Sequence, residues 1–187
     1  MVLPTRAFML TLVMLAGCHA ARGPAAGNDA ADDAPAANAA APARLTPLSI
    51  RTASGAHRFD VELAQTREAH EKGLSFRRAL APDSGMLFLF VPPQTATFWM
   101  KDTLIPLDML FIRADGTIAA IVADATPNSL ETKSAGEPVI AVLELAGGRA
   151  EALGIKAGDR VSWGPCVTGG APLNDNSPIL DFCPGAS

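Results

Sequence analysis

The stretch 107-LDMLFIRADGTIAAIVA-123 contains the clearest turn signal in the chain. Two largely apolar runs, 107–113 and 117–123, flank Asp115-Gly116, a dipeptide that favours the tight turn of a β-hairpin. The stretch therefore predicts two antiparallel strands. It also sets the pattern for the neighbouring sequence, in which short apolar runs alternate with turn residues.

The flanking sequence predicts further short strands. Residues 48–52 and 59–63 alternate in polarity around Ser54-Gly55, which indicates a second hairpin. The continuous apolar run 86–90 ends before Pro92-Pro93 and is typical of a strand buried on both faces. The other predicted strands are 95–100, 139–145 and 160–163.

Two short helices complete the predicted fold. Thr66 is a suitable N-cap for a helix over 67–72 that ends at Gly73, and a second helix over 148–153 ends at Gly154. Many short strands with two small helices predict a single α+β domain over 47–164. Its sheet is expected to be mainly antiparallel and barrel-like.

The first 17 residues predict an export signal. Arg6 precedes an apolar run over 7–16, which is too short for a membrane-spanning helix of roughly 20 residues. The sequence 15-LAGC-18 matches the bacterial lipoprotein box, in which the cysteine becomes the lipidated first residue of the mature chain. We therefore expect lipidation at Cys18, with an ordinary signal peptide as the alternative.

Residues 18–46 predict a flexible tether. They are rich in Ala, Pro, Gly, Asn and Asp, and such a segment buries too little apolar surface to offset the entropy of ordering it. In an organism with two membranes, His19 in place of an aspartate after the cysteine favours sorting to the outer membrane, by resemblance to the known lipoprotein sorting rule. The expected location is a lipid anchor in the cell envelope, at the periplasmic face of the outer membrane.

Charge and cysteine usage narrow the possible partners. The formal net charge is −4 without a basic run, which argues against nucleic acid as a partner. Besides Cys18, only Cys166 and Cys183 remain, and in an oxidising compartment two such cysteines usually pair. We expect this disulfide to close the C-terminal tail, 165–187. A metal site is not expected, because no histidine lies near either cysteine.

The densest polar cluster is 98-FWMKDTLIPLD-108. Together with 73-GLSFR-77, Leu80, 85-GMLF-88, 142-VLE-144 and the glycines near 147 and 158, it resembles a bacterial and archaeal family catalogued as domain of unknown function 192, also called uncharacterised protein family 0127. The resemblance covers about 48–163 and implies the same fold without an established activity. Ser75 and Asp102 depart from the methionine and asparagine that are usual in this family.

Several charges interrupt the apolar blocks, where an unpaired buried charge would cost several kcal/mol. One interpretation is structural: Arg77 pairs with Asp108 or Glu144 and fixes the strand register. The other places charges around a pocket with Trp99 and Met100 in its wall. The ligand-binding candidates are Trp99, Lys101, Thr103 and Asp108, and Lys101 is expected to be the charge left free for a ligand.

Two functions remain open at this stage. The first is a non-enzymatic binding or accessory module of the envelope that meets a small ligand, a glycan or a partner protein, without a cofactor. The second is a hydrolase that acts on an envelope glycan or peptide through Lys101, Asp108 and Glu144. No recognised catalytic motif is present, which favours the first, whereas a pocket carboxylate with a raised pKa would favour the second.

Overall fold

The computed structural model describes residues 45–169 and 181–184. The predicted signal peptide, Cys18 and the tether up to residue 44 lie outside the described residues. Within them, no helix has the length and apolar character needed to cross a membrane.

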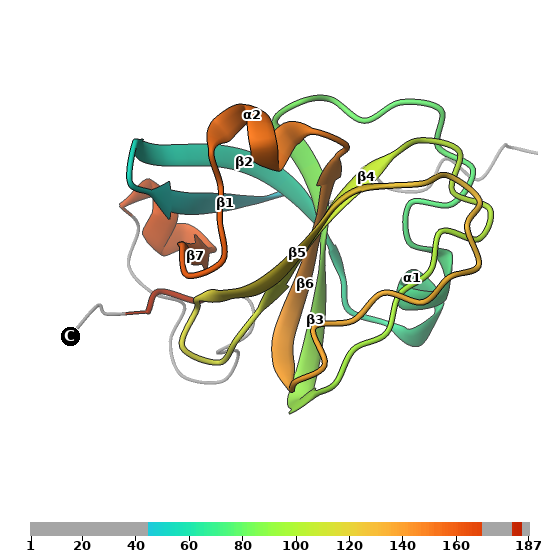
Figure 1. The fold of residues 1–187 in the computed structure, drawn as a ribbon. Helices are drawn as coiled ribbons and strands as arrows, with labels where there is room; N and C mark the ends of the chain where they lie inside the picture. Colours follow the sequence, from blue (N-terminus) through green and yellow to red (C-terminus); the bar gives the residue numbers. More distant parts are fainter. Residues whose placement is uncertain (1–44, 170–180, 185–187) are drawn as a thin grey trace, which may run out of the picture. The chain divides into compact units, whose positions relative to one another are not determined.

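Seven strands form one sheet in the order β5-β4-β6-β3-β2-β1-β7 (Figure 1). A single isolated bridge, between Thr117 and Arg160, links the two outer strands, so the sheet curls into a half-barrel. The strands are β1 (Leu45–Thr52), β2 (Gly55–Ala64), β3 (Ser84–Gln94), β4 (Leu107–Ile112), β5 (Ile118–Ala125), β6 (Val139–Ala146) and β7 (Arg160–Trp163).

The pairing is mostly antiparallel, as predicted, with one exception. β2 and β3 run parallel, from Asp60 opposite Ser84 to Ala64 opposite Phe88. Parallel neighbours need a long crossover connection, which residues 65–83 and helix α1 (Arg67–Lys72) provide here. The sheet is therefore mixed rather than purely antiparallel.

The helices begin and end where the capping residues predict. The Thr66 side chain accepts a hydrogen bond from the Ala69 N–H at 3.1 Å, and Gly73 follows the last turn of α1. Helix α2 (Arg149–Leu153) ends at Gly154 in the left-handed conformation, which suits glycine. A 3₁₀ turn, η1 (Pro165–Thr168), was not expected from the sequence.

Two details of the strand prediction are wrong. The segment 95–100 is a loop, because its N–H groups at Phe98 and Met100 donate to Lys133 and Ser129 of another loop instead of to a strand. β3 also continues through Pro92-Pro93 to Gln94, where a register shift lets it rejoin β6 at Val139.

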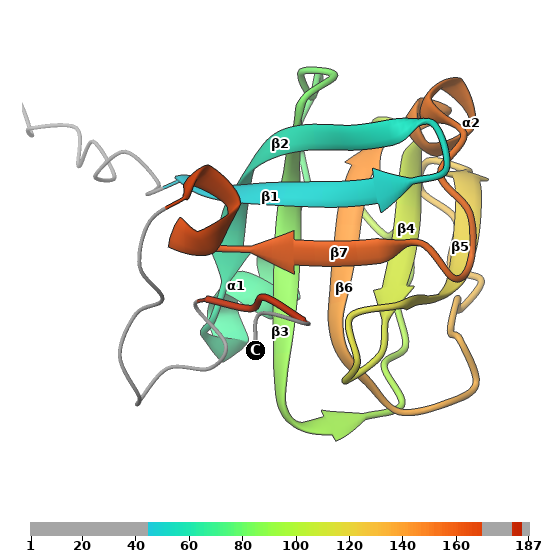
Figure 2. The same ribbon diagram turned by 90° about the vertical axis from the view of Figure 1, so that its left-hand side faces the viewer.

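The sheet has two apolar faces, which we call the inner core and the outer core. In Figure 2, β1, β2 and β7 run across β3, β6 and β4, and the inner core fills the space between these two groups. The outer core lies on the opposite face of β3, β6 and β4, where α1 and the 95–106 loop pack. Inner-core residues include Leu48, Ile50, Leu110, Leu143, Leu145 and Trp163; outer-core residues include Phe88, Met100, Met109, Phe111 and Val142.

Candidate functional site

A cavity of about 300 Å³ opens on the outer-core side of the sheet. This size is at the lower end of the range for ligand pockets, roughly 300–1,000 Å³. Its wall combines residues from α1, β3, β6 and the loop between β3 and β4. They include His70, Glu71, Lys72, Leu74, Phe88, Phe90, Phe98, Trp99, Lys101, Thr103 and Glu144.

Glu144 is the buried acid of this cavity. It lies on β6 with Met86 and Met109 as its cross-strand neighbours, and only 5% of the residue is exposed. Its carboxyl makes no hydrogen bond or ion pair with any residue in the described ranges. Burial among apolar side chains disfavours the ionised form and raises the pKa of Glu144 to about 8. Near neutral pH the group is therefore mostly protonated, and it can both donate and accept a hydrogen bond.

Aromatic rings surround the approach to this acid. Phe98 meets Phe88 edge to face at 5.0 Å between centroids, and the His70 ring meets Phe88 and Phe90 in the same way. His70 Nε2 lies 2.9 Å from the Ala64 carbonyl, which can only accept, so Nε2 carries a proton. These contacts fix the rings, which form the apolar part of a wall whose accessible surface is mostly polar.

Three of the four predicted ligand-binding residues line this cavity. The Trp99 side chain is 54% exposed, and Lys101 Nζ lies 5.5 Å from the centre of the Trp99 ring. Thr103 is buried. Within the described part of the chain, Lys101 makes no ion pair with a carboxylate, and its expected role toward a ligand stays a prediction. The cavity therefore joins these three residues to Glu144, which the sequence analysis had assigned to an ion pair or to catalysis.

The loop that carries these residues has a defined turn. Asp102 adopts a left-handed conformation (φ 58°), and its carbonyl accepts a hydrogen bond from the Phe76 N–H at 2.8 Å. Asparagine and aspartate both tolerate this conformation better than most residues. The departure from the usual asparagine thus leaves the backbone turn intact.

Asp108, the fourth predicted ligand-binding residue, does not reach the cavity. Asp108 lies on β4 opposite Leu145 of β6, whereas its neighbour Met109 lies opposite Glu144. Asp108 and Glu144 therefore point to opposite faces of the sheet. The Asp108 carboxylate accepts hydrogen bonds from the N–H groups of Asp124, Gly148 and Ala150, at 2.8, 3.1 and 2.7 Å. It caps the first turn of α2, whose own N-cap residue is a glycine without a side-chain bond.

The predicted partner of Arg77 is also wrong. Its guanidinium makes a two-pronged ion pair with Glu62 on β2, at 2.5 and 2.6 Å, and not with Asp108 or Glu144. The side chains of Arg77 and Glu62 are 35% and 22% exposed, so the pair is only partly buried. Glu62 is a polar residue between Val61 and Leu63, and a single alternating strand gives no sign of which distant cation it meets.

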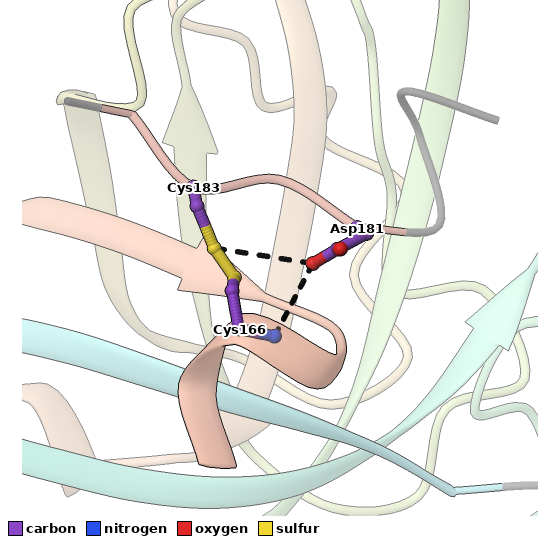
Figure 3. Close-up of side chains that lie close together, drawn as sticks. All are labelled: Cys166, Asp181 and Cys183. Carbon is purple, nitrogen blue, oxygen red and sulfur yellow. Dashed lines mark hydrogen bonds between the residues drawn. A yellow bond between two sulfur atoms is a disulfide. The ribbon is translucent and has the colours of Figure 1, made fainter. Parts of the chain in front are cut away.

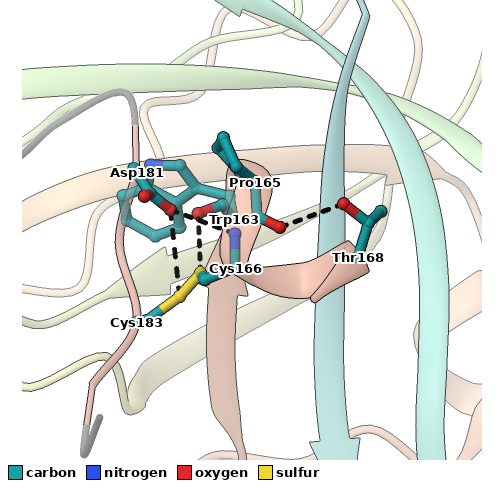
Figure 4. Close-up of a disulfide and its surroundings, with 6 residues drawn as sticks. All are labelled: Trp163, Pro165, Cys166, Thr168, Asp181 and Cys183. Atoms are coloured by element: carbon teal, nitrogen blue, oxygen red, sulfur yellow. Dashed lines mark hydrogen bonds between the residues drawn. A yellow bond between two sulfur atoms is a disulfide. The ribbon is translucent and has the colours of Figure 1, made fainter. Parts of the chain in front are cut away.

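Cys166 and Cys183 form the expected disulfide, with their Cα atoms 6.4 Å apart (Figure 3). The bridge fastens η1 to the segment 181–184, and the Asp181 carboxylate lies beside it (Figure 4). In the same segment, Phe182 stacks on Trp163 and exchanges two backbone hydrogen bonds with it. An Asp181 carboxylate oxygen lies within 4.8 Å of both sulfurs, a spacing that metal ligands can have. Because the bridge uses both sulfurs, it excludes a metal thiolate site at these residues.

The comparisons with known proteins agree with this architecture. The model of the family described as "Uncharacterized ACR" (DUF192) matches residues 49–163. The chain belongs to this family. No functionally curated protein matches the chain.

Two solved structures are similar to this chain. A protein of unknown function from Novosphingobium aromaticivorans is 45% identical, with a TM-score of 0.63 over 64% of this chain and 85% of that one. A protein described as a candidate transcription regulator from Sinorhizobium meliloti is 45% identical, with a TM-score of 0.62 over 64% of this chain and 93% of that one.

Proposed function

We propose that this protein is a non-enzymatic binding module whose outer-core cavity takes a small ligand. The observation that carries the proposal is Glu144, a buried carboxyl that faces the cavity without a hydrogen-bond partner among the described residues. Its oxygens are not sealed from the cavity, because Arg149 Nε is the one fully buried polar side-chain atom without a hydrogen-bond partner in the described part of the chain. A ligand group that enters the cavity can therefore reach the Glu144 carboxyl and bond to it in place of water.

The test compares wild type with Glu144→Met, which matches the neighbouring methionines in shape and removes the polar group. Both proteins are purified from the native envelope in mild detergent, and their organic extracts are compared by mass spectrometry. We expect a small molecule in near-stoichiometric amount with wild type and its loss from the variant. Identical extracts, after normalisation to protein, would refute the proposal.

We further propose that the chain is a lipoprotein that holds this domain in the cell envelope. The support is the sequence 15-LAGC-18 and the Ala- and Pro-rich segment that follows it. In cells fed a fatty-acid probe, the wild-type protein should carry the label and the Cys18→Ser variant should not. Fractionation of the membranes then tests the expected position at the outer membrane, and equal labelling of the two proteins would rule out an anchor at Cys18.

A hydrolase is the second candidate, and the raised pKa of Glu144 supports it. A carboxyl that stays protonated near neutral pH can act as a general acid. Its expected partner Asp108 faces the other side of the sheet, and Glu71 at the cavity is paired with Arg67, so a second free carboxylate is missing from the described wall. Release of products from purified envelope glycan or peptide by wild type but not by Glu144→Gln would decide for the enzyme.

We do not extend the description of the Sinorhizobium meliloti protein as a candidate transcription regulator to this chain. The net charge is −4 and the sequence has no run of basic residues, whereas nucleic-acid-binding domains are typically basic.

A further inference from the structure

The charged groups around the cavity are unevenly compensated. Helix α1 contributes His70, Glu71 and Lys72, the 95–106 loop contributes Lys101, and β6 contributes Glu144. Glu71 Oε1 lies 2.9 Å from the Arg67 guanidinium, which also lies 3.4 Å from Glu68 Oε1. Lys72 and Lys101 have no ion-pair partner in the described part of the chain, and both are exposed. The wall of the cavity thus carries two lysines without an ion-pair partner, and the exposed Asp102 follows Lys101 in the chain.

The interior has a different character from the mouth. Phe88, Phe98 and Trp99 supply the apolar part of the wall, while Glu144 and Thr103 supply buried hydrogen-bonding side chains. From solvent inward, the exposed lysines come before the buried Glu144, and the rings form part of the wall. A matching ligand has three corresponding parts.

We infer that the cavity takes a small organic anion with an apolar body and a neutral hydrogen-bonding group at its inner end. This inference rests on the proposed binding function and specifies its ligand class. The anionic group lies at the mouth beside Lys101 and Lys72, the body lies against the aromatic wall, and the inner group bonds to Glu144.

A cationic ligand is the opposing possibility, because an ionised Glu144 among aromatic rings would attract it. Two features disfavour this alternative. Such a ligand must pass two lysines that have no ion-pair partner among the described residues, and it must bind the ionised form of a carboxyl that burial keeps protonated near neutral pH. The two ligand classes predict opposite dependences on pH, so one titration series separates them.

Three probes of nearly the same shape make the test direct: 4-hydroxyphenylacetate, its neutral alcohol 4-hydroxyphenylethanol, and tyramine, which carries an ammonium group. Their affinities for the purified full-length chain are measured by ligand-observed NMR or calorimetry at low salt. We expect the acid to bind about fivefold more tightly than the alcohol, as one exposed charge pair allows, and tyramine to bind most weakly. Added salt should reduce the preference for the acid.

Two variants assign the effect to its residues. Lys101→Met keeps the length of the side chain and should remove most of the acid's preference over the alcohol, and adding Lys72→Met should remove the rest. Lys156→Met, far from this wall, is the control and should leave the preference unchanged. Between pH 7 and 9, ionisation of Glu144 should weaken binding of the acid to wild type about tenfold, but Glu144→Gln should bind almost equally at both pH values.

The outcomes separate this inference from the proposed function. Equal affinities for the three probes, a preference for tyramine, or tighter binding at pH 9 would overturn the anionic ligand and leave a binding cavity in place. No binding of any probe, together with identical envelope extracts from wild type and Glu144→Met, would overturn both.

Discussion

Asp108 and Glu144 are two buried carboxyl groups on neighbouring strands, and they have opposite surroundings. Asp108 on β4 accepts three backbone hydrogen bonds on the inner-core side. Glu144 on β6 lies one register position away, on the outer-core side, and accepts none from the described residues. Both residues are at most 5% exposed, so burial alone does not account for the difference.

The comparison indicates a division of labour between the two faces of the sheet. The Asp108 carboxylate accepts hydrogen bonds from one N–H group near the C-terminal end of β5 and from two at the start of α2. It therefore holds these two elements together at one corner of the half-barrel. Gly147 belongs to the same corner, because a Cβ there would lie 2.5 Å from Asp124 Oδ1. Among the described residues, the Glu144 side chain makes no hydrogen bond to another element, and under the proposed function it bonds to a ligand instead.

The largest expected effect is the loss of the Asp108 carboxylate. Asp108→Ala leaves three N–H groups of the α2 corner without an acceptor, and we expect it to lower the free energy of unfolding by about 3–5 kcal/mol. Urea denaturation measures the change. Asp60→Ala, an exposed acid on β2, is the control and should change stability by less than about 0.5 kcal/mol. Equal effects of the two substitutions would remove the structural role of Asp108.

The converse substitution at the other acid should stabilise the protein. Glu144→Met replaces a desolvated carboxyl without a protein partner in the described residues by an apolar side chain beside Met86 and Met109, and we expect the free energy of unfolding to rise by about 1 kcal/mol at pH 7. The same urea experiment measures it. A destabilised variant would mean that Glu144 has a structural partner after all, and the contrast with Asp108 would fail.

The pH dependence of stability gives a separate measure of the same contrast. The pKa of Glu144 is raised from 4.5 to about 8, so the folded state holds this proton while the unfolded state loses it. The contribution of Glu144 to the free energy of unfolding should be largest below pH 4.5. It should fall between pH 4.5 and 8 and level off above pH 8. The limiting slope for one proton is about 1.4 kcal/mol per pH unit.

Glu144→Gln isolates this contribution, because the amide keeps the size of the side chain and does not titrate. The difference in unfolding free energy between variant and wild type should grow as the pH rises from 5 to 8. A constant difference over that range would show that Glu144 titrates near its ordinary pKa and is better solvated than its burial indicates.

The fold was largely predictable from the sequence because its signals are local. The Asp115-Gly116 turn, the Thr66 N-cap and the glycines at 73 and 154 act within a few residues, and the corresponding hairpin and helices form as expected. The strand predicted at 95–100 was wrong because nothing local shows whether an extended segment finds a neighbouring strand.

The candidate site was only partly predictable because it depends on register. Trp99, Lys101 and Thr103 are close in sequence and reach the same cavity, as the cluster predicted. Asp108 and Glu144 are on different strands, and a shift of one residue between these strands would place them on the same face. The pairing of Arg77 with Glu62 likewise depends on the parallel placement of β2 beside β3, which no turn signal specifies.

The smallest expected effects concern the two basic residues, Arg77 and Lys101, which differ in the same way as the two acids. Arg77 is held by Glu62 in a partly exposed ion pair, and Arg77→Ala should cost about 1 kcal/mol, less than the 3–5 kcal/mol of a fully buried pair. Lys101→Ala loses only a contact over an exposed Trp99 ring and should cost about 0.5 kcal/mol.

Because the Arg77 pair is electrostatic and partly solvated, its contribution should shrink in 1 M NaCl. Thermal and urea melts of both variants at low and high salt measure these differences. If Lys101→Ala were the more damaging substitution, Lys101 would have a structural role, and the positive charge at the cavity mouth could not be reserved for a ligand.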